Sequence, residues 1–151
     1  MVTFPIPAFN AAVMTMANKV CPTGYDIGED APTSLPELNA YIEQNRRIKV
    51  DSRNSDRTIF GCPEHNWAFR AWHDWTHWRI GAEFTLQGER AVAARQISDL
   101  KLVFGTACPP LWEALILEEV VGQAEHQHRT GEFPRDQLAF AREALGLGSG
   151  S

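Results

Sequence analysis

Prolines and glycines divide the second half of this chain into four segments of helical length. Proline is tolerated in the first turn of a helix, and glycine is the usual residue just beyond the last turn. Pro63 and Gly81 bound the first segment, and Gly105 and Gly131 end the next two. The pattern predicts helices at Pro63–Ile80, at Gln87–Phe104, from Pro109-Pro110 to Arg129, and from Phe133-Pro134 to near Leu145.

The first half is less regular but carries two further helix signals. Pro7 is placed to start a helix over Pro7–Lys19. Ser34 and Glu37 have the spacing of a capping box, which opens a helix over Leu35–Asn45. Between that helix and the next, a short strand is expected at Arg47–Val50, followed by a polar connector over residues 51–58.

The length of 151 residues and the 44% hydrophobic content suit one packed core. We therefore expect an all-α fold, a compact bundle of about five helices with an irregular N-terminal region. Residues 1–145 would form this single helical domain. Residues 146–151, with the linker-like sequence GLGSGS, would form a flexible tail.

Charge and composition argue against several classes of protein. The net charge is −5 and no block of lysine or arginine occurs, so a duplex nucleic-acid coat or an anionic-membrane binder is not expected. No run of 18 apolar residues is present, which argues against a spanning helix. The first residues lack the features of a signal peptide, and three scattered cysteines match neither a disulfide framework nor a zinc ribbon. A cytoplasmic protein is the expectation.

The histidines carry the first indication of chemistry. All five lie between positions 65 and 128, and His73 and His77 are spaced i, i+4, which stacks both rings on one helical face. Imidazoles in this arrangement can share a metal ion. Asn66 and Arg70 extend the same polar face, and tryptophans occupy the other sides of the helix. A helix so covered should be largely buried, so its polar stripe would face the interior.

Polar side chains on the two following helices could meet this stripe. Glu89 and Gln96 share a face of one helix, and Glu119, Gln123 and His126 share a face of the next. Helical bundles build metal sites from inward-facing Glu and His on neighbouring helices. The predicted ligands of one or two divalent ions (Zn, Mn or Fe) are His73, His77, Glu89, Glu119 and, as a possible fifth, His126. Asn66, Gln96 and Gln123 would hold the ligands by hydrogen bonds.

Each of these residues also has a purely structural interpretation. His73 and His77 could bond to carbonyls at the edge of the core, and Glu89 and Glu119 could face solvent. His126 could lie at an exposed helix end, where a cation is favoured. The pattern does not choose between Glu118 and Glu119.

Short stretches of the chain resemble known families. The string His73-Asp74-Trp75-Thr76-His77 resembles the HD-type metal phosphohydrolases, and the Glu/His distribution is similar to that of ferritin-type di-iron bundles. Residues 68–77 (AFRAWHDWTH), with EVVGQ at 119–123 and TGEFP at 130–134, resemble a group of small bacteriophage proteins without an established activity. This last resemblance implies a viral or prophage origin and, for a phage protein, the host cytoplasm.

The favoured hypothesis is a metal-dependent hydrolase acting on a small phosphate-containing or similar anionic substrate. Arg70 and Asp74 are its candidate catalytic residues, with Arg70 holding the anion by a forked contact. One alternative is a ferritin-like di-iron oxidoreductase. Another is a non-enzymatic phage protein that binds a host protein, and the chain could also form a homo-oligomer.

Overall fold

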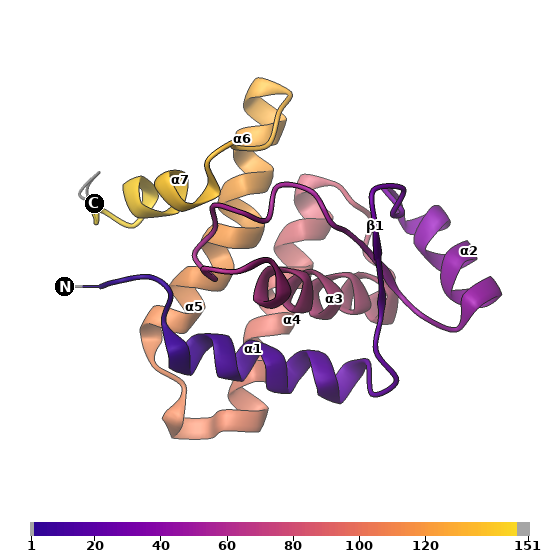
Figure 1. Ribbon diagram of the computed structural model, residues 1–151, viewed down its shortest axis with the longest axis horizontal. Coiled ribbons are helices and arrows are strands. Elements are labelled where there is room, and N and C mark those ends of the chain that lie inside the picture. Colours follow the sequence, from indigo (N-terminus) through magenta and orange to yellow (C-terminus); the bar gives the residue numbers. More distant parts are fainter. Residues whose placement is uncertain (1, 148–151) are drawn as a thin grey trace.

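The computed structural model describes residues 2–147 of the chain. Helix α3 (Pro63–Ile80) is the element around which the others pack. It contacts α1 (Pro7–Val20), α2 (Leu35–Asn45), α4 (Leu86–Phe104) and strand β2 (Lys49–Asp51). Figure 1 shows α1 below α3, with α2 and strand β1 at one end and the C-terminal helices at the other. These C-terminal elements are α5 (Pro110–Leu117), the π-helical η2 (Glu118–Gly122), α6 (Gln123–Thr130) and α7 (Gln137–Ala144).

The predicted all-α fold is confirmed. Because α5, η2 and α6 follow one another without a break, the described residues form six α-helical rods and one short 3₁₀ turn, η1 (Gly105–Ala107). The helices predicted at Leu35–Asn45 and Pro63–Ile80 have these bounds in the structure. Within residues 2–147, no helix combines the length and apolar character needed to cross a bilayer.

The capping signals act as the sequence suggests, with one exception. Ser34 accepts a hydrogen bond from the Glu37 amide at 3.3 Å, and the Glu37 carboxylate accepts in turn from the Thr33 amide at 3.1 Å. The last helix does not start at Phe133-Pro134 as expected. It begins at Gln137, because the Asp136 side chain accepts the Ala139 amide and caps the helix there.

Two short strands form the only sheet in residues 2–147. β1 (Asp26–Gly28) pairs in parallel with β2, with Ile27 opposite Val50. Helix α2 provides the crossover that a parallel pair needs. The strand expected at Arg47–Val50 is thus shifted by one or two residues, and β1 was not predicted.

The predicted tail is tied to α7 at its start. The amides of Gly146 and Leu147 donate to the carbonyls of Glu143 and Arg142, at 3.1 and 2.8 Å. The rest of the predicted tail, 148–151, lies outside the described residues.

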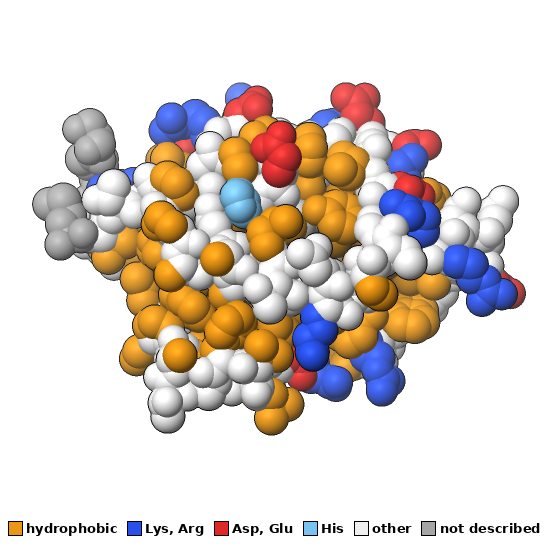
Figure 2. Space-filling view, turned by 60° about the horizontal axis from the view of Figure 1, so that its bottom comes forward, with side chains coloured by type: hydrophobic (Ala, Val, Ile, Leu, Met, Phe, Trp, Pro, Cys, Tyr) orange, Lys and Arg blue, Asp and Glu red, His pale blue; other side chains and the backbone are white. Residues whose placement is uncertain are grey.

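Two groups of buried side chains flank α3. The larger joins α1, α3, α4 and α5 and includes Phe9, Trp72 and Leu115, while the smaller, around Leu38 and Val50, lies under α2. Trp72 is fully buried, but Trp78 is 41% exposed. The side of α3 that carries Trp78 therefore faces solvent, and the helix is not buried on every side. Figure 2 shows a different face, where hydrophobic side chains gather on one side of the molecule. Large side chains left exposed include Leu102 and Val103 at the end of α4 and Leu117 at the end of α5.

Candidate metal centre

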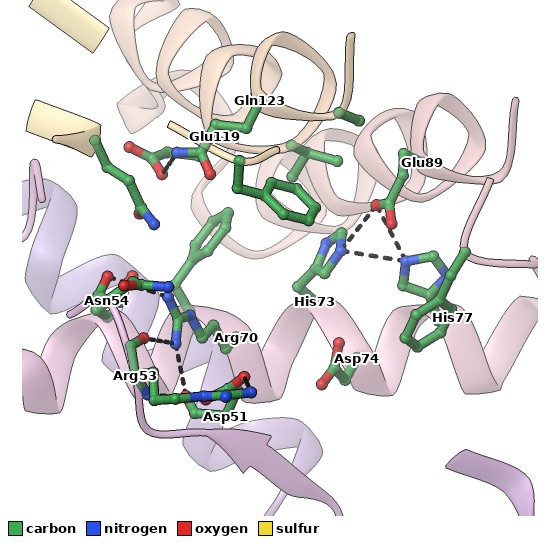
Figure 3. Close-up of a pocket in the computed structure, with 17 residues that line it drawn as sticks. Asp51, Arg53, Asn54, Arg70, His73, Asp74, His77, Glu89, Glu119 and Gln123 are labelled. Carbon is green, nitrogen blue, oxygen red and sulfur yellow. Dashed lines mark hydrogen bonds and ion pairs between the residues drawn. The ribbon is translucent and has the colours of Figure 1, made fainter. Parts of the chain in front are cut away.

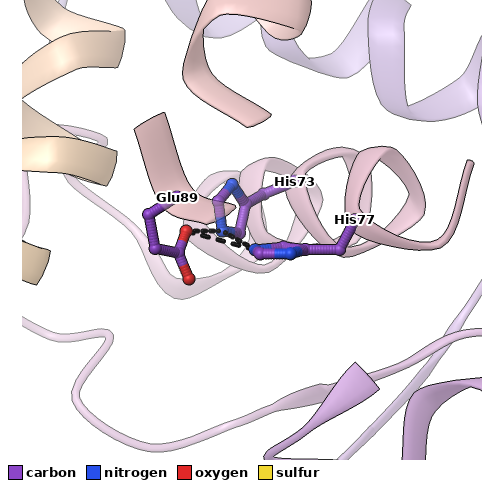
Figure 4. Close-up of side chains that lie close together, drawn as sticks. All are labelled: His73, His77 and Glu89. Atoms are coloured by element: carbon purple, nitrogen blue, oxygen red, sulfur yellow. Dashed lines mark hydrogen bonds and ion pairs between the residues drawn. The ribbon is translucent and has the colours of Figure 1, made fainter. Parts of the chain in front are cut away.

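The two histidines of α3 meet one glutamate of α4. The Nε2 atoms of His73 and His77 lie 2.9 and 3.1 Å from the same Glu89 carboxylate oxygen, and 3.2 Å from each other (Figure 4). For a tetrahedral ion with bonds near 2.05 Å, ligand atoms are separated by about 3.3 Å. The three atoms are therefore already spaced within about 0.5 Å of what one zinc ion requires.

The turn between α3 and α4 places Glu89 over the histidines. Gly81 takes a left-handed conformation (φ 68°) that ends α3. Gly88 sits where the Glu83 carbonyl comes so close that any Cβ would collide with it. Thr85 caps α4 by accepting the Gly88 amide at 3.1 Å. Glu89 thereby lies in the first turn of α4, where the helix dipole favours a carboxylate.

Both imidazole rings are held by their other nitrogen. The Nδ1 atom of His73 lies 2.9 Å from the carbonyl oxygen of the Gln96 side chain, and Nδ1 of His77 lies 2.9 Å from the Ala82 backbone carbonyl. Because both partners can only accept, each Nδ1 carries the proton and donates it. In the neutral form of either ring, the Nε2 lone pair then faces Glu89, and this is the tautomer that metal-binding histidines use.

Without a metal, a proton takes the place of the cation. Burial disfavours a charge on His73, but the adjacent Glu89 outweighs it and raises the pKa of His73 to about 9. Burial also opposes ionisation of Glu89, yet its contacts with His73 and His77 lower its pKa to about 2. A metal ion would therefore compete with one proton for this position.

The group lies at one end of a cavity of about 270 Å³ (Figure 3). Glu119 and Gln123 lie at the other end, and Arg70 lies with the segment Asp51–Asn54 across from them. The apolar wall includes Phe69, Phe84, Val120 and Phe133. Two of these rings orient the histidines, since Phe69 stacks on His73 and Phe84 lies 4.4 Å from the His77 ring centre.

Glu119 faces the cavity from an irregular turn. The helix predicted to run unbroken to Arg129 contains the π-helical segment η2, a feature often found at functional sites. Glu119 is buried, and one of its oxygens accepts a hydrogen bond from the Gln123 amide nitrogen at 2.8 Å. The other oxygen, Oε1, has no partner within residues 2–147.

Glu119 rather than Glu118 lines the cavity. Burial and the neighbouring Glu118 carboxylate raise the pKa of Glu119 to about 8. Glu118 packs beside Gly122 instead, and burial together with Glu125 raises its pKa to about 7. Of the two glutamates between which the sequence did not choose, the structure places Glu119 at the cavity. Glu119 is nevertheless not among the three side chains grouped around the candidate metal position, contrary to its prediction as a ligand.

Arg70 does not extend a free fork into the cavity. Its Nη1 donates to the backbone carbonyls of Asp51 and Arg53, both at 2.6 Å, and its Nη2 donates to that of Asn54 at 3.3 Å. The guanidinium therefore holds the 51–54 segment against α3. This arrangement differs from the expected contact with an anionic substrate.

The remaining predicted residues are spread over the cavity and beyond it. Asp74 lines the cavity, and burial raises its pKa to about 6. Asn66 also lines it but donates to Ser55 rather than to a candidate ligand. His126 lies outside the group, because its ring packs edge-on against Phe140 of α7 at 5.0 Å.

Two groups at the site were not predicted from the sequence, the backbone carbonyl of Ala82 and the side chain of Gln137. The Ala82 carbonyl could have been anticipated from Gly81, because a left-handed turn at a helix end folds the next residues back toward the last turn. Gln137 lines the cavity from the first turn of α7, and no local pattern points to it.

Comparison with known proteins adds no assignment to this geometry. Neither a protein-family model, nor a curated protein, nor a solved structure matches the chain. The function therefore has to be inferred from the side chains and their positions.

Proposed function

We propose that this protein is a metal-dependent hydrolase that holds one divalent ion, with zinc the best fit, between His73, His77 and Glu89. The observation that carries the proposal is the pair of Nδ1 hydrogen bonds, to Gln96 and to Ala82. They leave two nitrogen lone pairs and a carboxylate oxygen within 3.2 Å of one another. Three acceptors at this separation need a cation or a proton between them.

The donor set also favours one ion over two. A di-iron bundle draws carboxylates from several helices, with bridging glutamates and Glu-x-x-His pairs. Here the group contains a single carboxylate, and the next candidate, Glu119, is bonded to Gln123 and stands apart from the group. Two imidazoles and one carboxylate are a set that zinc enzymes use.

Three protein ligands leave a coordination position free for water, as in catalytic rather than structural zinc sites. The three side chains lie on the wall of the cavity, so this position is accessible to a small substrate. A bound divalent ion supplies an acidified water near neutral pH. His73, His77 and Glu89 would hold the ion, which would supply this water as the nucleophile for hydrolysis.

The chain's own residues would orient the ligands and shape the site. Gln96 and Ala82 fix the two rings, and phenylalanine side chains line the cavity beside them. Glu119, whose carboxyl group has a pKa raised to about 8, lies at the other end of the cavity, where it faces the part of a substrate remote from the metal.

Metal analysis of protein purified without a histidine tag tests the proposal. We expect about one zinc per chain after equilibration, and well under half of that for His77→Ala. The matched control is His126→Ala, which removes an imidazole outside the group and should bind zinc like the wild type. Zinc should also raise the melting temperature of the wild type and of the control, but not that of His77→Ala.

Turnover provides the second part of the test. Chromogenic ester and phosphate substrates should be hydrolysed by the zinc-loaded protein, not by the chelated protein, and again after zinc is restored. Zinc binding without any turnover would favour a structural metal in a non-enzymatic binding protein. Equal zinc content in the wild type and His77→Ala would remove the proposed centre altogether.

A further inference from the structure

The end of the cavity opposite the metal centre contains a buried acceptor without a donor. Glu119 is only 9% exposed, and its Oε2 accepts from Gln123 at 2.8 Å. Its Oε1 is buried and unpartnered among the described residues, on a side chain that lines the cavity. An unpaired buried acceptor costs about 1–3 kcal/mol, a cost that a ligand donating an N–H would remove.

The two arginines that line the cavity do not pair with Glu119. Arg53 pairs with Asp51 at 2.9 Å, and Arg70 donates to backbone carbonyls. Glu119 forms no ion pair with any residue in the range 2–147. An ammonium group that reaches Glu119 therefore does not displace an existing ion-pair partner.

The space between the two ends suits a short apolar linker. Figure 3 shows apolar side chains between Glu119 and His73, and Phe69, Val120 and Phe133 are among the residues that line the cavity. The volume of about 270 Å³ equals that of roughly nine liquid waters, which is room for on the order of ten non-hydrogen atoms.

We propose that this cavity binds a small molecule that carries a primary ammonium group, which donates to Oε1 of Glu119 while the reacting group at its other end reaches the metal. This inference rests on the proposed metal centre and names the substrate class of that site, an amino-terminated ester or amide. An ammonium ion in contact with Glu119 lowers the pKa of the carboxyl group and ionises it. The bound ligand then replaces the water that burial keeps away from this oxygen.

Two hydroxamates of equal chain length test the proposal. Hydroxamate groups bind zinc, and 6-aminohexanohydroxamic acid differs from hexanohydroxamic acid only by the terminal ammonium. We expect calorimetry on the zinc-loaded protein to show at least about tenfold tighter binding of the amino compound, since ionic hydrogen bonds of this kind are worth about 1.5–3 kcal/mol. Equal affinities would overturn the amine subsite and leave the metal centre standing.

Variants assign the preference to Glu119. Glu119→Gln should lose the tenfold preference but still bind hexanohydroxamic acid. The control Glu132→Gln removes the same charge from an exposed position and should keep the preference. If Glu119→Gln does not fold, Glu119→Leu fills the space without a buried polar group and should show the same loss. A preference that survives in the folded Glu119 variant contradicts the proposal.

Failure of the metal centre is recognised separately. If the wild type binds no zinc, the proposed function fails, and the subsite is then tested with hexylamine and hexanol on the metal-free protein by NMR titration. Binding of hexylamine in preference to hexanol, lost in Glu119→Gln, supports the subsite by itself. Equal binding of the two compounds overturns it.

Discussion

The two ends of the cavity each hold a glutamate, Glu89 half-buried and Glu119 buried, and the two carboxyl groups behave in opposite ways. Glu89 has two imidazole nitrogens within 3.1 Å, which overcome the effect of burial and lower its pKa to about 2. Glu119 accepts from an amide on one oxygen and has no partner for the other among the residues that the structure describes, and burial with Glu118 raises its pKa to about 8. Partners, rather than burial alone, therefore decide which carboxyl group is charged. Glutamates whose pKa values are pushed apart in this way suit different roles, here a metal ligand and a partner for an ammonium group.

The largest expected effect comes from removing the charge of Glu89, which leaves an uncharged side chain at the metal end of the cavity as well as at the Glu119 end. Glu89→Gln removes the charged ligand but keeps its shape, so zinc affinity should fall by at least about 100-fold. Loss of a partner that merely orients a ligand already costs 10–100-fold. Competitive titration against a zinc chelator measures the change, with Glu132→Gln as the control of equal charge. An affinity within a factor of about three of the wild type would exclude Glu89 as a ligand.

Glu119→Gln should sharpen the contrast through the pH dependence of stability. The carboxyl keeps its proton up to about pH 8 in the folded protein but loses it near its ordinary value of 4.5 when unfolded. Between these values the folded state binds more protons, so the free energy of unfolding falls as the pH rises. From about pH 5 to about pH 8, the wild type should lose about 3–4 kcal/mol more than the variant.

Urea unfolding at a series of pH values, with chelator present, measures this difference. Glu118, whose pKa is raised to about 7, remains in both proteins, so its own titration adds to both curves. Glu132→Gln should follow the wild type. Parallel curves for Glu119→Gln and the wild type would show that Glu119 ionises normally in the folded protein.

Gln96→Met should weaken the metal end without removing a ligand. The substitution nearly preserves volume but removes the acceptor for Nδ1 of His73, so zinc affinity should fall about tenfold. Gln127→Met makes the same change at a position outside the group and should leave the affinity unchanged. A Gln96→Met protein with wild-type affinity would mean that Gln96 packs beside His73 without orienting it.

Arg70→Lys should have the smallest effect. It tests how Arg70 holds the 51–54 segment, which lines the cavity. Lysine cannot reproduce the fork that bonds the carbonyls of Asp51, Arg53 and Asn54, so unfolding should become easier by about 1 kcal/mol. Zinc affinity should not change, while proteolysis within the 51–54 segment should become faster. Unchanged stability combined with weaker substrate binding would instead support the anion contact predicted from the sequence.

Local signals predicted most of the helices because those signals act within a few residues. Pro63 and Gly81 bound α3 in the sequence and in the structure, and the Ser34 cap starts α2. Elements whose partners are distant in sequence were missed or shifted. Strand β1 exists only because Lys49–Asp51 lies beside it. The first turn of α7 is held by Arg57, whose carbonyl accepts from the Leu138 amide and whose side chain pairs with Asp136 at 2.9 Å.

The candidate site divides in the same way. The i, i+4 spacing of His73 and His77 was enough to place both rings together, and the helical stripe placed Gln96 and Glu89 on one face of α4. The position of Glu119 relative to that group was not predictable. It depends on the π-helical turn η2, whose wider winding no periodicity argument anticipates, and on the packing of α4 against η2.

By itself, the sequence determined a helical protein with imidazoles on one face of a buried helix, because hydrogen bonding along a helix and the 3.6-residue repeat are local. Only the tertiary structure decided that Glu89 meets both rings, that Arg70 is occupied by a loop, and that His126 turns toward α7. Those outcomes follow from how neighbouring helices are set against one another, and that setting minimises the free energy of the whole core rather than of any one segment.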